Sequence, residues 1–286
     1  MHYAVMVDEV LEYLAIRPEG VYIDATLGLG GHTKAIAERL ATGIVIGIDR
    51  DPESIEIAKR NAAGQADRIR FQRARFSELS STLPAYGLTQ VDGLIADLGV
   101  SRFQLTEAER GFSLMADGPL DMRMDRSEGQ TAADLVNFSA EKALADLIYR
   151  YGEERRSRKI ARAIVRARPV RSTLHLASVI EQAAPRTGRL HPATQTFMAL
   201  RMAVNGEQEE LDALLAGVPD LVRRGGRVVV ISFMSLEDRK VKQSFQGLAR
   251  AGRARILTKH VVKPRETETQ KNPASRSAKL RALEMN

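Results

Sequence analysis

The chain has 286 residues, 44% of them hydrophobic, which is enough for one large domain or for one domain with an insertion. It has no cysteine, which excludes disulfides, thiolate metal sites and a cysteine nucleophile and fits a reducing compartment such as the cytoplasm. The formal net charge of +7 favours a polyanionic partner such as nucleic acid, although a basic surface can also serve solubility alone. Acidic residues interrupt the apolar N-terminal run and no apolar stretch is long enough to cross a bilayer, so we expect neither a signal peptide nor a membrane span.

The first hundred residues alternate between short apolar runs and helical patterns. The apolar runs predict buried strands at residues 21–25, 44–49 and 91–97, with a weaker one at 68–71. Helical spacing follows the first run at residues 33–40, and a second helix opens at Pro52, a residue favoured in the first turn. This alternation indicates a parallel sheet covered by helices on both faces.

The pattern then becomes mostly helical, with helices expected at residues 140–150, 153–167 and 174–184. Sheet signals return at residues 225–233, followed by a helix at 236–250 and strands at 255–262 and 279–284. We therefore predict an α/β fold with a doubly wound, mostly parallel, Rossmann-like sheet. Residues 1–105 and 206–286 would form this discontinuous domain, and residues 106–205 a helical insertion domain for substrate or RNA recognition.

A glycine-rich loop, DATLGLGG, runs from Asp24 to Gly31 between the first strand and its helix. Glycines allow the backbone to turn sharply and to approach a ligand closely. Asp49 follows 18 residues after Gly31 and can accept hydrogen bonds from ribose hydroxyls. A dinucleotide site has a similar layout, but the full GxGxxG pattern is missing, and an acid four residues before the first glycine suits a cofactor with an amino-acid end. A tight turn without any ligand is the remaining interpretation.

Asp97 ends the fourth expected strand. Ligands of open parallel sheets bind beyond the carboxyl ends of the strands, so Asp97 is expected on the same edge as the glycine loop and Asp49. Asp is also a common cap of turns, so the position alone leaves both interpretations open.

A basic segment covers residues 151–171, and four of its cationic side chains recur at helical spacing: Arg155, Lys159, Arg162 and Arg166. Such a face could follow RNA phosphates. It could also be a solvated face paired with Glu153 and Glu154. The run at residues 263–276 is a second candidate for RNA contact, and no spacing of His, Asp or Glu indicates a metal site.

Ten sequence runs, in the same order along nearly the whole chain, resemble the ribosomal RNA small-subunit methyltransferase H family. They are HYAVMVDEV, DATLGLGGHT, IDRDP, DLGVS followed by Gln104, ERGFS, DGPLDMRMD, YGEER, HPATQTFMALRMAVN, GGRVVVISF and SLEDR, with DLGVS and its glutamine counted as one run. The resemblance implies a class I methyltransferase sheet, S-adenosylmethionine as cofactor, and methylation of N4 of a cytidine in the decoding region of 16S rRNA. The partner would be 16S rRNA or the small ribosomal subunit in the cytoplasm, with the oligomeric state left open and a homodimer among the options.

Carried over motif by motif, the resemblance implies cofactor contacts at Gly30, Gly31, His32, Asp49, Phe76, Asp97 and Gln104. Cytosine N4 is a poor nucleophile because its lone pair is delocalised, so a carboxylate that accepts its hydrogens would assist the transfer. Asp97 is the first candidate for this catalytic role, with Asp121 and Asp125 as alternatives. Methylation at carbon 5 of cytosine normally needs a cysteine adduct, and this chain has no cysteine.

Several positions depart from the family pattern, among them Arg102, Gln195, Met234 and Ala274. Several of them lie where substrate RNA is expected to dock. A divergent paralogue that methylates another RNA, or a non-catalytic RNA-binding relative, therefore remains an alternative. A nicotinamide oxidoreductase built on the same sheet is a third, disfavoured by the incomplete glycine pattern.

Overall fold

The structure is a computed structural model, and it describes residues 4–186, 188 and 190–286. The chain divides into two compact units: one combines Met1–Val100 with Gln208–Asn286 and the other is Ser101–Glu207. We call them the sheet unit and the helical unit. The expected boundaries lay at residues 105/106 and 205/206. No helix in the described part of the chain is long and apolar enough to cross a membrane.

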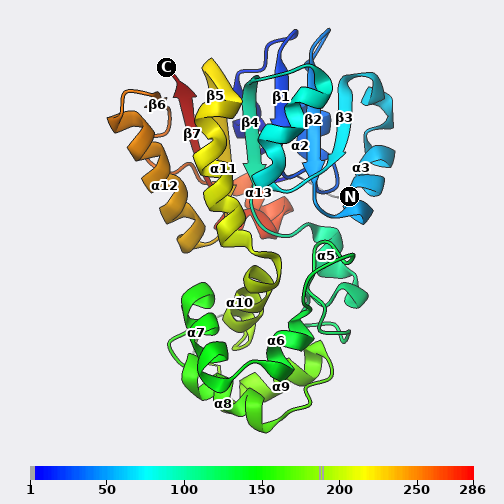
Figure 1. Ribbon diagram of the computed structural model, residues 1–286, viewed down its shortest axis with the longest axis vertical. Coiled ribbons are helices and arrows are strands. Elements are labelled where there is room, and N and C mark those ends of the chain that lie inside the picture. Colours follow the sequence, from blue (N-terminus) through cyan, green and yellow to red (C-terminus); the bar gives the residue numbers. More distant parts are fainter. Residues whose placement is uncertain (1–3, 187, 189) are drawn as a thin grey trace. The chain divides into compact units, whose positions relative to one another are not determined.

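The sheet unit is built on one mixed sheet whose strands, within the described residues, follow the order β3-β2-β1-β4-β5-β7-β6 (Figure 1). The neighbours from β3 to β5 pair in parallel, whereas β7 is antiparallel to both β5 and β6. The predicted doubly wound, mostly parallel α/β class is therefore confirmed. The strands are β1 (Val21–Asp24), β2 (Ile44–Asp49), β3 (Ile69–Arg73), β4 (Val91–Asp97), β5 (Val222–Ser232), β6 (Ala254–Ile256) and β7 (Lys279–Met285).

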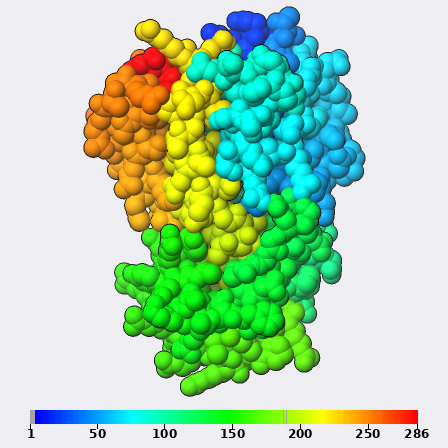
Figure 2. Space-filling model, in the orientation of Figure 1, coloured from blue at the N-terminus to red at the C-terminus, as the bar shows by residue number. Residues whose placement is uncertain are grey.

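Helices cover both faces of this sheet because its central strands are apolar on both sides. Along β1, Tyr22 packs into one cluster with α1 and α2, whereas Ile23 packs into the opposite cluster with α11 and α12. Figure 2 shows part of the second face, where α11 lies beside the segment of α4. The backbone N and the hydroxyl of Ser77, just before α4, donate to Glu210 of α11. The helices of this unit are α1 (Val7–Leu14), α2 (Gly31–Ala37), α3 (Pro52–Asn61), α4 (Leu79–Thr82), α11 (Glu207–Leu221), α12 (Ser235–Arg250) and α13 (Glu266–Lys271).

The helical unit contains α5 (Arg102–Thr106), α6 (Ala132–Phe138), α7 (Glu141–Gly152), α8 (Ser157–Arg166), α9 (Thr173–Ala183) and α10 (Thr194–Asn205). Helix α8 shows why the segment folds this way: Ile160, Ala161 and Ile164 are buried on one side and the arginines face outwards. Helix α7 packs against both α8 and α10. Short 3-10 turns complete the chain at Ala63–Arg68, Phe76–Glu78, Leu83–Tyr86, Ala108–Arg110 and Pro273–Ser277.

Three local expectations are corrected. The strand expected at residues 255–262 is only Ala254–Ile256, and beyond it Val262 forms a single bridge to Leu280. The helix expected at 153–167 begins at Ser157, because Glu153 has the left-handed φ of 51° that ends α7 and Glu154 accepts a hydrogen bond from Arg156 N. The helix expected at 33–40 instead spans Gly31–Ala37.

Candidate active site

Asp49 joins the glycine loop to the end of strand β2. Its Oδ2 accepts a hydrogen bond from Gly28 N at 2.8 Å, and its Oδ1 accepts one from Asp51 N at 2.9 Å. Each carboxylate oxygen keeps a lone pair for a further donor. Burial raises the pKa of Asp49 to about 6, against the two backbone hydrogen bonds that lower it. Asp49 therefore lies where a ribose hydroxyl could donate to it, at the edge predicted from the sequence.

Gly30 and Gly31 occupy positions where a side chain is hard to place. Gly30 has a φ of 86°, a left-handed conformation that L-residues adopt only at a cost, and a Cβ there would lie 3.2 Å from the Cβ of Ala58. A Cβ on Gly31 would lie 2.6 Å from the Cβ of Ala4. These glycines allow the chain at Ala4, helix α3 and the loop to pack closely, so their first role is in the fold of the loop itself.

Asp24, the first residue of the loop, is fully buried and used within the protein. Thr33 Oγ1 donates to its Oδ2 at 2.6 Å, and Thr26 N donates to its Oδ1 at 3.1 Å. Burial raises the pKa of Asp24 although these partners lower it. The carboxylate braces both ends of the loop, which differs from a direct contact to the amino-acid end of a cofactor.

Asp97 is the last residue of β4, and it faces His32, which lies at the start of α2. Its backbone N donates to Thr26 Oγ1 at 2.6 Å, and its Oδ2 lies 3.5 Å from His32 Nε2. The other oxygen, Oδ1, is buried and has no hydrogen-bond partner among the described residues. A buried acceptor without a donor is costly unless a ligand supplies one, so this atom marks a binding position.

Phe76 lies on the same edge of the sheet, and Gln104 belongs to the other unit. Ala74 N donates to the carbonyl of Asp49 at 3.1 Å, so the chain leaving β3 runs beside Asp49 and reaches the half-buried Phe76 two residues later. Gln104 is buried in the first turn of α5, where its Oε1 accepts a hydrogen bond from Ser101 N at 3.0 Å. A cofactor contact of Gln104 stays a prediction.

The chemistry of this edge fits S-adenosylmethionine, the cofactor implied by the resemblance. That molecule carries ribose hydroxyl donors, an ammonium group and a sulfonium cation. Asp49 offers acceptors for the hydroxyls, the carboxylate of Asp97 offers a negative charge on the same edge, and Phe76 offers an apolar ring for a purine. Nothing at this edge resembles a metal centre: no three His, Cys, Asp or Glu side chains of the described residues are grouped to hold an ion.

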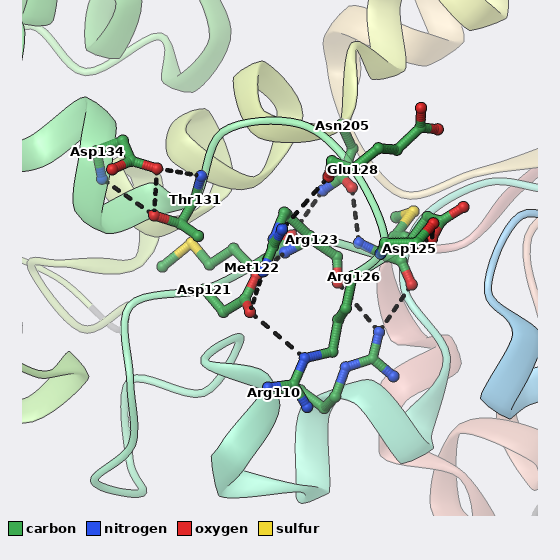
Figure 3. A network of polar contacts seen from close by, with 12 residues as sticks. Arg110, Asp121, Met122, Arg123, Asp125, Arg126, Glu128, Thr131, Asp134 and Asn205 are labelled. Carbon is green, nitrogen blue, oxygen red and sulfur yellow. Dashed lines mark hydrogen bonds and ion pairs between the residues drawn. The ribbon is translucent and has the colours of Figure 1, made fainter.

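The motifs ERGFS and DGPLDMRMD meet in the helical unit around the buried side chain of Arg110 (Figure 3). Its Nη2 donates to the carbonyls of Arg123 at 3.0 Å and Met124 at 2.9 Å. Asn205, at the end of α10, accepts from Met124 N and donates to the carbonyl of Met122, whose φ is 60°. These contacts fix the backbone of the motif in one conformation.

Asp121 and Asp125, the alternative catalytic candidates, have partners in this network. Arg123 donates to Asp121 through Nε at 2.7 Å and Nη2 at 3.0 Å, and Arg126 lies 3.4 Å from its Oδ2. Burial would raise the pKa of Asp121, but these guanidinium groups hold it below its usual value. Asp125 Oδ1 accepts hydrogen bonds from the backbone N and the hydroxyl of Ser127. Both carboxylates thus have a structural use.

The predicted basic face is exposed but only partly helical. Lys159, Arg162 and Arg166 project from α8, whereas Arg155 lies in the turn before it. Arg162 Nε lies 3.4 Å from an oxygen of Glu141 on α7, so one of these cations is shared with an acid. The interpretation as a solvated face with acidic partners therefore holds for Arg162, though through Glu141 and not Glu153 or Glu154.

Sequence reasoning missed four side chains that organise these two regions: Thr33, Arg110, Asn205 and Glu268. Thr33, Arg110 and Asn205 lie inside the motifs, which was the only available signal for them. A buried arginine and an exposed one look alike in a sequence. Glu268 of α13 accepts from Met6 N at 2.8 Å and acts electrostatically on His32, a pairing of distant segments that no local pattern indicates.

Comparison with known proteins places the chain in one methyltransferase family. The model of the MraW methylase family matches residues 1–286. A protein named ribosomal RNA small subunit methyltransferase H from Solibacter usitatus is 64% identical over 285 residues, covering 100% of both chains. Proteins of the same name from Syntrophobacter fumaroxidans and Acidobacterium capsulatum are 48% and 50% identical, covering 99% of this chain and 96% and 98% of theirs. The chain therefore belongs to the MraW methylase family, and its methyl donor is S-adenosylmethionine.

Proposed function

We propose that this chain transfers a methyl group from S-adenosylmethionine to N4 of a cytidine in the decoding region of 16S rRNA, cytosine 1402. Support comes from relatives named as small-subunit rRNA methyltransferases and from the basic net charge of +7, which suits a polyanionic substrate. The single observation that carries the chemistry is the buried, unpartnered Oδ1 of Asp97.

In this proposal Asp97 accepts a hydrogen from the cytosine amine. The cofactor supplies an electrophilic methyl group on its sulfonium, and the amine must lose a proton when it gains that methyl. A carboxylate oxygen that holds the amine hydrogen orients the amine for in-line attack and then takes the proton. Oδ1 suits this role because its acceptor capacity is not used by the described residues, whereas Oδ2 faces His32.

Asp121 and Asp125 are less suited to this role. Asp121 shares its charge with two guanidinium groups, which disfavour protonation of its carboxylate. Asp125 holds a turn through Ser127. We therefore assign them to the fold of the helical unit.

Nitrogen methylation is also favoured over carbon methylation. Attack on carbon 5 of cytosine normally requires a covalent adduct with a cysteine thiolate, because the ring carbon is otherwise not nucleophilic enough. The chain contains no cysteine, so this route lacks its nucleophile. An exocyclic amine needs only a hydrogen acceptor and correct positioning.

RNA contact is assigned to the helical unit, which we propose recognises the substrate. The exposed cations of α8 supply a stripe for phosphates, with Arg155 extending it beyond the helix: Arg155, Lys159, Arg162 and Arg166. At Gln195, one of the departures from the family pattern, Nε2 donates to the carbonyl of Gly152 at 3.0 Å and so ties α10 to the end of α7. This position therefore has a structural use that does not require another RNA target.

The deciding experiment measures N4-methylcytidine in small-subunit rRNA from a strain lacking the gene, by nuclease digestion and mass spectrometry. We expect the modification to be absent at the decoding-region cytidine and to return with the wild-type gene. Asp97→Asn should restore it about 100-fold more slowly, the scale of losing a proton acceptor. Asp67→Asn, the same change at an exposed acid, is the matched control. Unchanged N4-methylation in the deletion strain would remove the assigned substrate and favour another RNA.

A further inference from the structure

His32 is a buried, ionisable side chain surrounded by carboxylates from elements far apart in the sequence. It is 5% exposed at the start of α2. Its Nε2 lies at an ion-pair distance of 3.5 Å from Asp97 Oδ2 at the end of β4, and it makes no hydrogen bond to a described residue. The other acids that act on it are Asp24 at the end of β1 and Glu268 on α13. Burial alone would favour the neutral form of the imidazole, whereas the surrounding carboxylates favour its cationic form.

The two oxygens of Asp97 differ in what they face. Oδ2 faces His32, and Oδ1 is buried without a hydrogen-bond partner among the described residues. The backbone of Asp97 is held by Thr26, which accepts from its N. The carboxylate plane can nevertheless rotate about the last side-chain bond, since that torsion is broad and nearly two-fold. The imidazole of His32 lies against Oδ2 and so makes the surroundings of the two oxygens different.

We propose that His32 is a positioning residue that holds Oδ2 of Asp97, so that Oδ1 faces the reacting amine. The inference rests on the proposed function in one respect, namely that Asp97 accepts a hydrogen of the substrate. It adds a role for the imidazole that is separate from binding the cofactor. When the carboxylate is already held in one orientation, the free-energy cost of ordering it does not add to the activation barrier, which is the advantage of a preorganised site.

Charge supports this arrangement. Burial lowers the pKa of His32, but the adjacent carboxylate of Asp97 raises it, and Asp24 and Glu268 add to this, so the net shift is upward. The cationic imidazolium, which donates from both ring nitrogens, therefore persists to higher pH than in an ordinary histidine. As pH rises through that value the charge is lost and the neutral imidazole holds Oδ2 less strongly, so the transfer rate should decline on the alkaline side.

The pairing itself can be tested without any methyl transfer. We would titrate the imidazole of His32 by NMR in the free full-length protein, in wild type, in Asp97→Asn and in the matched control Asp67→Asn. We expect the pKa of His32 to fall towards or below its ordinary value of 6.5 only when Asp97 is neutralised. The same pKa in wild type and Asp97→Asn would overturn the proposal.

The positioning role is tested by kinetics of two variants. His32→Ala removes the contact, and we expect kcat to fall about 100-fold, the scale of a misplacement of about 1 Å, with the Kd for S-adenosylmethionine changed less than about threefold. His32→Gln keeps a donor without the charge, so we expect a kcat between those of His32→Ala and the wild type and no alkaline decline. The exposed His260→Ala is the matched control. A loss of cofactor affinity as large as the loss of kcat would overturn the proposal, as would unchanged kcat in His32→Ala.

The two proposals fail in different ways. If the wild-type protein does not methylate the decoding-region cytidine, the proposed substrate is wrong, yet the NMR titration still decides whether His32 and Asp97 are coupled. If methylation occurs and the titration shows no coupling, the positioning role is wrong and the proposed function stands.

Discussion

Affinity for S-adenosylmethionine should weaken about tenfold when the pH is lowered from 7 to 5, because Asp49 takes up a proton in that interval. Burial raises the pKa of this carboxyl to about 6. A cofactor whose ribose hydroxyls donate to Asp49 prefers the ionised form, and each pH unit below the pKa then costs about 1.4 kcal/mol of binding free energy. The apparent Kd is accordingly close to its limit at pH 7 and about ten times weaker at pH 5.

The raised pKa of Asp49 has the opposite effect on stability: as pH rises, cofactor affinity increases but the free energy of unfolding falls. The folded protein holds the proton of Asp49 more tightly than the unfolded chain, whose reference value is 3.8. This group alone therefore lowers the free energy of unfolding as pH rises from about 4 to 6. Cofactor binding to the ionised form offsets that loss, so the stabilisation by the cofactor should be larger at pH 7 than at pH 5.

Isothermal titration calorimetry at pH 5, 6 and 7 measures the affinity directly. Asp49→Asn removes the titrating group, and we expect it to weaken binding at pH 7 by about 1–3 kcal/mol and to abolish most of the pH dependence. Asp67→Asn, at an exposed acid, should leave both unchanged. A pH dependence of equal size in wild type and Asp49→Asn would refute the reasoning, because another group would then be responsible.

Three further predictions concern the fold and the RNA. Gly30→Ala should lower the free energy of unfolding by about 1–3 kcal/mol, since φ is 86° and the new Cβ would lie 3.2 Å from Ala58; denaturant unfolding measures this. Arg110→Met should cost about 3 kcal/mol in the same assay, because it leaves the part-buried carbonyls of Arg123 and Met124 without their charged donor. Lys159→Ala combined with Arg166→Ala should weaken rRNA binding and reduce the slope of log K against log salt by about two.

Each of these has a matched control. Gly64→Ala adds a Cβ that meets nothing within 4 Å, and equal destabilisation by both glycine changes would contradict the role of Gly30. Arg158→Met changes an exposed arginine, so a loss as large as that of Arg110→Met would argue against the buried network. Lys142→Ala removes an exposed lysine paired with Asp146, and an equal change in salt slope would count against the stripe on α8.

The sequence by itself determined the class of the fold and the edge of the sheet where the cofactor chemistry lies. Alternating strand and helix patterns are local, and they predict a parallel sheet whose strand ends carry Asp49 and Asp97. Ordered motifs pointed to the family, and the family model over the whole chain confirmed it. The strand at 255–262 was overestimated because β6 lies beyond β7 at the sheet edge and pairs over only three residues.

Only the tertiary structure decided what the individual polar side chains do. The fold supplies partners that the sequence did not indicate: Thr33 donates to Asp24, and Arg123 donates to Asp121. Oδ2 of Asp97 lies 3.5 Å from Nε2 of His32, which belongs to another element of the fold. The physical reason is that a carboxylate's role is set by its burial and its nearest donors, and folding brings those donors from segments that no sequence pattern relates.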